Sequence, residues 1–355
     1  MDVVYLVNVS RSMKYLELVI IGIAVIATSA LAADRRHVAP QEVGPVLYRM
    51  PVDGITALAP ASAGGVWYLP DFLDPPFIGR LTRYDGIQLS SLNASQIASA
   101  EDGSLWLASR AALVRVGSDG IAVTYPATAG YISAITFDLS GRPWFINRDA
   151  RLVGFFDRMA QRIVEYPLPA SLSEPKFVVA GPDGKIWVVT AKGGIGIVSA
   201  DGVVAELETS ELRGQPVTAV ASTAAECWIA IGCRSCNHIS CPFPDDRGAI
   251  IAISASREWR VVTNVGHNDI SALAAGQDGS VFALKAIMSV FDGSFHPGPL
   301  LVIRPDGSIR QLATQLPSST NGASAGMLAV SSDGGVWGAF TNPNVIFRFP
   351  SWQVR

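Results

Sequence analysis

Short apolar segments alternate with turns rich in Gly and Asp along most of the chain. In residues 177–207, FVVAGPDGKIWVVTAKGGIGIVSADGVVAEL, one apolar run ends at an Asp-Gly pair and the next carries Trp187. Two further apolar runs then flank a second Asp-Gly pair. Asp-Gly is typical of tight β-hairpins because both residues tolerate the positive φ that such turns require. The pattern predicts four short antiparallel strands in this stretch.

The same unit recurs seven times. Each copy has an Ala-rich apolar segment, a turn, and a second apolar segment with a central aromatic residue. The seven aromatic residues are Trp67, Trp106, Trp144, Trp187, Trp228, Phe282 and Trp337. Four antiparallel strands repeated at a period of roughly 40 residues are the sequence signature of a β-propeller. We therefore predict an all-β fold, a seven-bladed β-propeller of four-stranded antiparallel blades over residues 46–355, with the aromatic residues packed between blades.

A strand-like segment precedes the first copy and has no blade of its own. Residues 46–50, VLYRM, resemble the fourth strand of a blade. We expect this segment to pair onto the last blade, so that the two ends of the propeller meet and no sheet edge is left open.

The first 32 residues differ in character from the rest. Arg11 and Lys14 precede the apolar run YLELVIIGIAVIATSALAA, which ends in small residues. A charged start, an apolar centre and a small-residue cleavage site predict a secretory signal peptide over residues 1–32, with Met1 or Met13 as the start. Residues 33–45 are then an N-terminal tail, and the protein is secreted or periplasmic. The alternative is an uncleaved N-terminal helix that anchors the protein.

The composition limits the kinds of binding partner that we expect for this protein. The chain is 49% hydrophobic and 16% charged with a net charge of −3, so it can bury a large core. No basic stretch stands out, which argues against nucleic acid as a partner. No later segment is long and apolar enough for a bilayer. We expect a monomer whose partner is a small molecule, a peptide or a cell-envelope protein.

The amino-acid sequence of the blades resembles that of a known family. Residues 131–169, YISAITFDLSGRPWFINRDARLVGFFDRMAQRIVEYPLP, together with residues 177–207, resemble the repeats of the streptogramin lyases, or virginiamycin B lyases. The resemblance covers residues from about 40 to the end. It implies a seven-bladed propeller and a carbon–oxygen lyase that opens a cyclic depsipeptide antibiotic by elimination, with a magnesium ion. It also implies catalytic His residues just before inner strands and Glu three residues after the blade aromatic.

This chain departs from that catalytic pattern. No His stands directly before an inner strand. The residues three positions after the blade aromatic are Pro70, Ser109, Asn147, Thr190, Ile231, Lys285 and Phe340. None is Glu, so we favour a propeller that binds a ligand or partner. The first alternative is a lyase or hydrolase, with or without a metal ion, acting on a cyclic peptide, lactone or related small molecule. The second is a structural interaction module.

The sequence also indicates where a site would lie. In a propeller, one face gathers the connections between second and third strands and those that lead to the next blade. These loops vary without disturbing the blades. Long insertions at 232–248 and 285–299 fall there. The candidate catalytic or metal-binding residues in and around them are His238, His267, His296 and Asp269. The alternative is surface histidines that share a face.

Basic residues from blades 2 to 4 fall on the same face. The candidate ligand-binding residues are Arg110, Asn147, Arg148, Lys192 and, across the face, Asp292. They predict a polarised funnel for an anionic ligand. The alternative is ordinary solvated surface charge.

The four cysteines are clustered. They are Cys227, Cys233, Cys236 and Cys241. In an exported protein an even, clustered set predicts two disulfides, with the pairing left open. A bridge from Cys227 would tie the loop back to its blade. The alternatives are a zinc site and a redox-active Cys233–Cys236 pair.

Overall fold

The described part of the chain forms one compact unit within Gly44–Arg355. The computed structural model describes residues 45–49, 54–61, 64–70, 77–81, 87–88, 94–209, 212–232, 248–266, 269–288, 295–314, 326–340 and 345–355. Within these residues the strands form seven four-stranded antiparallel sheets, which we number as blades 1 to 7 in chain order. The predicted fold class is confirmed.

Each of blades 1 to 6 uses four consecutive strands. Blade 1 contains β2 (Ile55–Pro60), β3 (Val66–Pro70), β4 (Phe77–Leu81) and β5 (Ile87–Gln88). Blade 2 contains β6 (Ala94–Ser99), β7 (Leu105–Ser109), β8 (Ala112–Val116) and β9 (Ala122–Pro126). Blade 3 contains β10 (Ile132–Phe137), β11 (Pro143–Asn147), β12 (Leu152–Asp157) and β13 (Arg162–Pro167). Blade 4 contains β14 (Pro175–Ala180), β15 (Ile186–Thr190), β16 (Ile195–Val198) and β17 (Val204–Leu207).

Blades 5 and 6 contain the longest strands, and blade 7 combines strands from both ends of the chain. Blade 5 contains β18 (Val217–Ser222), β19 (Glu226–Ile231), β20 (Gly248–Ser254) and β21 (Trp259–Gly266). Blade 6 contains β22 (Asp269–Ala275), β23 (Val281–Met288), β24 (Phe295–Ile303) and β25 (Ile309–Leu312). Blade 7 contains β26 (Gly326–Val330), β27 (Val336–Phe340), β28 (Val345–Phe349) and β1 (Val46–Arg49), and the short helix α2 (Ser351–Val354) follows β28.

Blade 7 joins the two ends of the propeller. Strand β1 pairs antiparallel with β28, from Val46 opposite Arg348 to Arg49 opposite Val345. The ring of Tyr48 stacks on Trp337 with 5.6 Å between centroids. The predicted closure by the segment that precedes the first repeat is confirmed.

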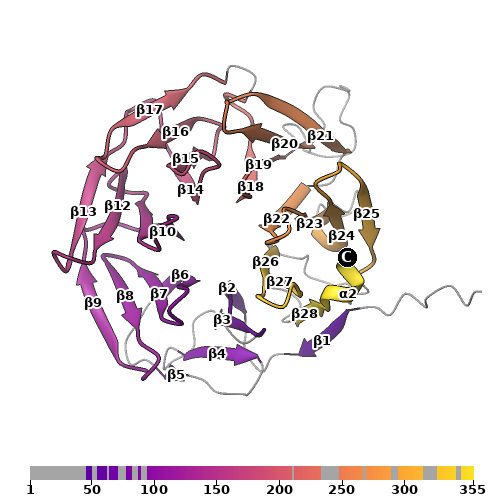
Figure 1. Ribbon diagram of the computed structural model, residues 1–355, viewed down its shortest axis with the longest axis horizontal. Coiled ribbons are helices and arrows are strands. Elements are labelled where there is room, and N and C mark those ends of the chain that lie inside the picture. Colours follow the sequence, from indigo (N-terminus) through magenta and orange to yellow (C-terminus); the bar gives the residue numbers. More distant parts are fainter. Residues whose placement is uncertain are drawn as a thin grey trace, which may run out of the picture. The chain divides into compact units, whose positions relative to one another are not determined.

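The first strands of the blades surround the central axis (Figure 1). Each contacts the first strand of the next blade, and the contact of β26 with β2 completes the circle. In β2 and β18 buried residues alternate with half-buried ones. Small Ala side chains suit these strands because the available space narrows toward the axis.

The blade aromatics pack as the sequence predicts. Six of the seven are buried and Trp67 is half-buried. Trp187 of blade 4 belongs to an apolar cluster with Ile229 and Ile251 of blade 5. The hydrophobic core is therefore divided into layers between neighbouring blades.

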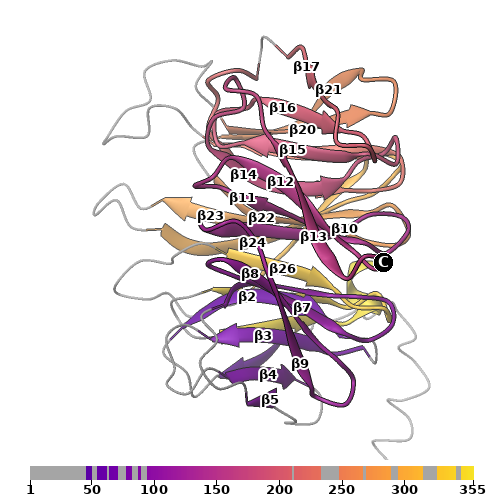
Figure 2. The same ribbon diagram turned by 90° about the vertical axis from the view of Figure 1, so that its left-hand side faces the viewer.

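The strands run across the thickness of the unit, so each connection lies at one of two faces (Figure 2). One face carries the turns that join the first strand of each blade to the second and the third strand to the fourth. We call it the hairpin face. There Gly184 and Gly202, in Asp-Gly turns, have φ of +74° and +84°. The opposite side, with the remaining connections, is the loop face. None of the described helices is long and apolar enough to cross a membrane.

Candidate functional site

Asn147 lies on the loop face of blade 3 but is a structural residue. Its side chain is fully buried. Its Nδ2 donates to the carbonyl of Thr128 at 2.8 Å, and its Oδ1 accepts from the backbone N–H of Ala150 at 3.2 Å. One N–H and one lone pair of the amide thus hold neighbouring connections, and the side chain is shielded from solvent. Burial disfavours contact with a ligand, so the assignment of Asn147 to ligand binding stays a prediction, because the sequence gives polarity but not burial.

The basic residues do gather on the loop face. Arg148 is exposed, lies over the ring of Tyr131 at 5.6 Å and approaches Asp149 at 3.8 Å. Lys192 is exposed and forms an ion pair of 3.0 Å with Glu174. Arg110 is exposed in the β7–β8 turn. Exposed pairs of this kind contribute little to stability, so these cations remain available for an incoming anion.

A repeated irregularity marks the loop-face ends of the inner strands. In blades 1 to 6 the pairing of the first two strands shifts by one residue near the start of the first strand. The residues at the shift are Thr56, Ser95, Ser133, Lys176, Thr218 and Ser271. Five carry a hydroxyl and only Lys176 carries a charge.

Lys176 was missed in the sequence. Its Nζ donates to the carbonyl of Val217 in blade 5 at 3.1 Å and lies 4.9 Å from the ring centre of Phe177. The residue is exposed as a whole, while partial desolvation of its ammonium lowers its pKa. Its role becomes visible only when the six inner strands are aligned, because the other blades have Ser or Thr at this position.

The candidate catalytic residues are only partly covered by the structure. His238 and His267 lie outside the described residues, as does Asp292, a candidate for ligand binding. Asp269 begins β22, and its side chain also lies outside them. His296 is the second residue of β24, opposite Ile287, and is half-buried. The proposed cluster of histidines therefore stays a prediction.

Cys227 is a free, fully buried thiol. It lies among Ile229, Ile251 and Trp187 in the apolar layer between blades 4 and 5. The structure shows no bridge from Cys227, so the predicted disulfide of this residue finds no support there. Cys233, Cys236 and Cys241 lie outside the described residues, and their pairing stays a prediction.

The magnesium ion implied by the family resemblance finds no matching donor set in the described part of the chain. No group of three or more His, Cys, Asp or Glu side chains there is arranged to hold a metal ion. We derive no reaction step through a metal.

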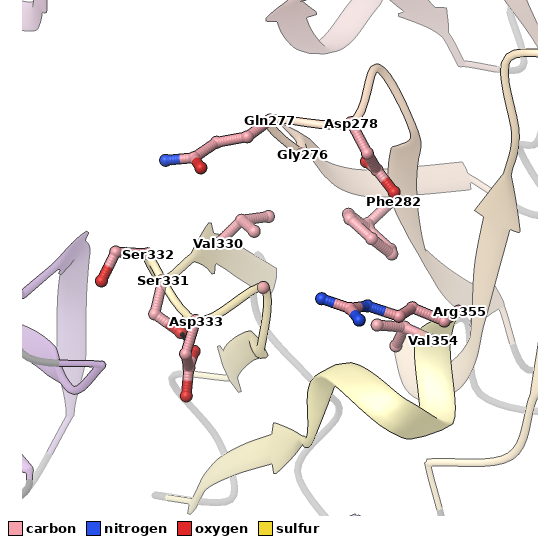
Figure 3. Close-up of a pocket in the computed structure, with 11 residues that line it drawn as sticks. Gly276, Gln277, Asp278, Phe282, Val330, Ser331, Ser332, Asp333, Val354 and Arg355 are labelled. Atoms are coloured by element: carbon pink, nitrogen blue, oxygen red, sulfur yellow. Dashed lines mark hydrogen bonds between the residues drawn. The ribbon is translucent and has the colours of Figure 1, made fainter.

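Two cavities in the described residues open on the hairpin face instead. One, of about 390 Å³, lies between the first turns of blades 6 and 7, beside the chain end. Figure 3 shows Arg355 pointing into it next to Phe282, with Asp278 and Asp333 on the two turns. Both carboxylates already accept hydrogen bonds within their own turns. The second cavity, of about 630 Å³, shares Gln277, Val330 and Ser332 with the first.

The protein is therefore a seven-bladed β-propeller. Carboxylates stabilise the turns of its hairpin face, and its loop face carries exposed cations. The sequence profile described as the virginiamycin B lyase family matches residues 49–241, more than half of the chain. The protein belongs to the virginiamycin B lyase family.

Solved structures agree on the fold. A streptogramin B lyase structure superposes with a TM-score of 0.66 at 17% identity, covering 86% of this chain and 98% of that one. Virginiamycin B lyase from Staphylococcus aureus gives 0.64 at 16% identity, with the same coverage. A chain of the mitotic checkpoint complex gives 0.63 at 13% identity, covering 90% and 99%. At such identities the likeness shows the fold alone. No functionally curated protein matches in sequence.

Proposed function

We propose that this protein is a binding propeller that receives a small molecule or peptide on its loop face and does not open it. The proposal rests on one observation. At three or more of the seven positions where the family resemblance implies catalytic Glu, the side chain is buried and supports its blade. Asn147 is buried and joins two connections, and Phe340 is fully buried. Thr190 is buried and accepts the backbone N–H of Gly194 at 2.8 Å.

These positions cannot supply a general base without remodelling of the fold. A catalytic base must reach the proton that it removes and must sit near its operating pKa. Amide and phenyl side chains have no suitable proton acceptor, and the hydroxyl of Thr190 already closes its own turn. The exposed cations of blades 2 to 4 remain as recognition groups for an anionic or strongly polar ligand.

Quinupristin provides a direct test, because a catalytically inactive virginiamycin B lyase from S. aureus has been solved with it. Elimination inside a cyclic ester gives a linear isomer of the same mass, whereas hydrolysis adds one water. Incubation should therefore be followed by chromatographic retention together with mass. We expect quinupristin to remain cyclic, while active S. aureus enzyme run in parallel opens it. An isomer of shifted retention would overturn the proposal and establish the lyase alternative.

If ring opening did occur, the remaining candidates would be testable one by one. His238, His267 and His296 are the only histidines outside the N-terminal tail. Each histidine should then be replaced by Ala in turn. The variants that lose turnover would identify the histidines that act on the substrate. Loss of activity on chelation, restored by magnesium, would identify a metal-assisted reaction.

We also propose that the protein is exported through its N-terminal signal segment and acts as a monomer outside the cytoplasm. The charged start, apolar run and small residues before Ala33 support this. N-terminal sequencing of the protein recovered from the cell envelope or medium should begin near Ala33. Recovery of an intact N-terminus in the membrane fraction would favour the anchored alternative.

A further inference from the structure

The shift residues of the inner strands normally bond within the propeller. Thr56, Thr218 and Ser271 donate to the second-strand carbonyl of their own blade at 3.1–3.4 Å. Ser95 does the same at 3.3 Å and also lies 2.9 Å from the carbonyl of Ile132 in the next blade. A hydroxyl at this position therefore forms a hydrogen bond that holds the first strand of the blade to the second near the axis.

Two of the six depart from this arrangement, and they belong to neighbouring blades. The Oγ of Ser133 in blade 3 is buried with no hydrogen-bond partner among the described residues. Lys176 in blade 4 replaces the hydroxyl by an ammonium that bonds across to Val217. The inner strands of blades 3 and 4, β10 and β14, are in contact. The departure is thus local to one part of the ring.

The ammonium of Lys176 has no carboxylate partner in the described part of the chain. The nearest acidic residue in sequence, Glu174, is bound to Lys192 at 3.0 Å. A carbonyl and an aromatic face are its recorded contacts. Lys176 is exposed as a residue, and partial desolvation of its ammonium lowers its pKa. A bound anion would reach this ammonium and supply the opposite charge that the described residues do not place there.

We propose that the loop-face ends of the inner strands of blades 3 and 4 bind an oxyanion through the ammonium of Lys176. The ligand group is a carboxylate, phosphate or sulfate. The exposed guanidinium of Arg148, whose turn is bonded to Tyr131 beside β10, adds positive potential on the same face. This inference rests on the proposed binding role of the loop face and names the chemistry that the site recognises.

The repeat supplies a matched variant. Lys176→Ser gives blade 4 the side chain that other blades carry at this position, so the fold should be retained. Lys185→Ser removes the same charge from an exposed position in the first turn of the same blade, on the hairpin face. Lys176→Arg keeps the charge. Calorimetric titration of the purified protein with inorganic phosphate, sulfate and acetate then separates the three oxyanions.

We expect at least one of the three to bind wild type and Lys185→Ser equally, and to bind Lys176→Ser at least about tenfold more weakly, as loss of a charged hydrogen bond implies. Lys176→Arg should stay within a few fold. Equal affinity in Lys176→Ser, or no binding of any oxyanion to wild type, would overturn the site. Quinupristin titrated in parallel keeps the two proposals apart. Its binding by Lys176→Ser as tightly as by wild type would leave the binding propeller standing without this subsite.

Discussion

The indole Nε1–H of Trp187 donates a 2.8 Å hydrogen bond to the carboxylate of Asp183. Asp183 belongs to the Asp-Gly turn and Trp187 to the following strand, so in blade 4 the turn and the aromatic residue are directly linked. The same bond joins Trp144 to Asp138 at 2.9 Å in blade 3. In these two blades the turn carboxylate positions the aromatic ring in the layer between blades.

Replacing Trp187 by Phe tests this link. The variant keeps most of the apolar packing but removes the donor and some volume, so we expect a loss of about 2 kcal/mol in the free energy of unfolding. Trp352→Phe is the control, because Trp352 is 63% exposed and its loss should be within about 0.5 kcal/mol. Urea denaturation measures both. Equal stability of the two variants would show that the indole bond is unimportant.

Asp138 should make the stability of the protein depend on pH. Burial by itself raises the pKa of Asp138, but hydrogen bonds from Ser140, Trp144 and Arg142 outweigh it and lower the pKa from 3.8 to about 2. A carboxyl with a lowered pKa in the folded state stabilises above its unfolded pKa, and this stabilisation is lost as pH falls from about 4 to about 2.

Asp138→Asn should therefore cost about 2 kcal/mol at pH 7, and its difference from wild type should shrink steadily below pH 4. Urea denaturation at several pH values gives the comparison. Asp119→Asn, in an exposed turn with one backbone hydrogen bond to its carboxylate, is the control and should cost less. A difference for Asp138→Asn that stays constant down to pH 2 would contradict the role of its charge.

Asn147 should behave as a structural residue. Asn147→Ala removes both hydrogen bonds of a buried amide and leaves a carbonyl and an N–H without partners, which should cost about 2–3 kcal/mol. Arg148→Ala, at the exposed neighbouring position, should change stability by less than about 0.5 kcal/mol. Thermal unfolding of both variants decides. If Asn147→Ala kept wild-type stability but lost ligand binding, the residue would be a recognition group.

Cys227 should resist thiol reagents in the folded protein. Burial, with a smaller effect from the charge of Asp183, raises the pKa of this thiol to about 12, so almost no reactive thiolate is present near pH 8. We expect peptide-resolved alkylation to leave Cys227 unmodified until denaturant is added, with no need for a reductant. Alkylation only after reduction would show that Cys227 is in a disulfide.

Tyr48 should contribute to ring closure. Its ring stacks on Trp337, whereas the neighbouring Leu47 is 42% exposed. Tyr48→Ala should lower the free energy of unfolding by about 2 kcal/mol. Leu47→Ala, in the same strand, should lower it by less than about 1 kcal/mol. Matching losses would mean that β1 is held by its backbone pairing alone.

The sequence by itself determined the seven blades, their turns and the closing strand. This information is local: alternation of apolar residues indicates a strand, and Asp-Gly between two such strands favours a hairpin. The sequence could also exclude the family's catalytic pattern, because that pattern depends on residue types at fixed distances from the blade aromatic.

Only the tertiary structure decided what several polar residues do. Asn147 and Arg148 are neighbours in sequence, yet one is buried and the other exposed, because consecutive residues at a strand end face different surroundings. Cys227 turned out to face a layer between blades that is built from two distant segments. Lys176 acquires its contact with Val217 because a one-residue shift in pairing redirects its side chain toward the next blade, and such shifts are fixed by packing around the axis.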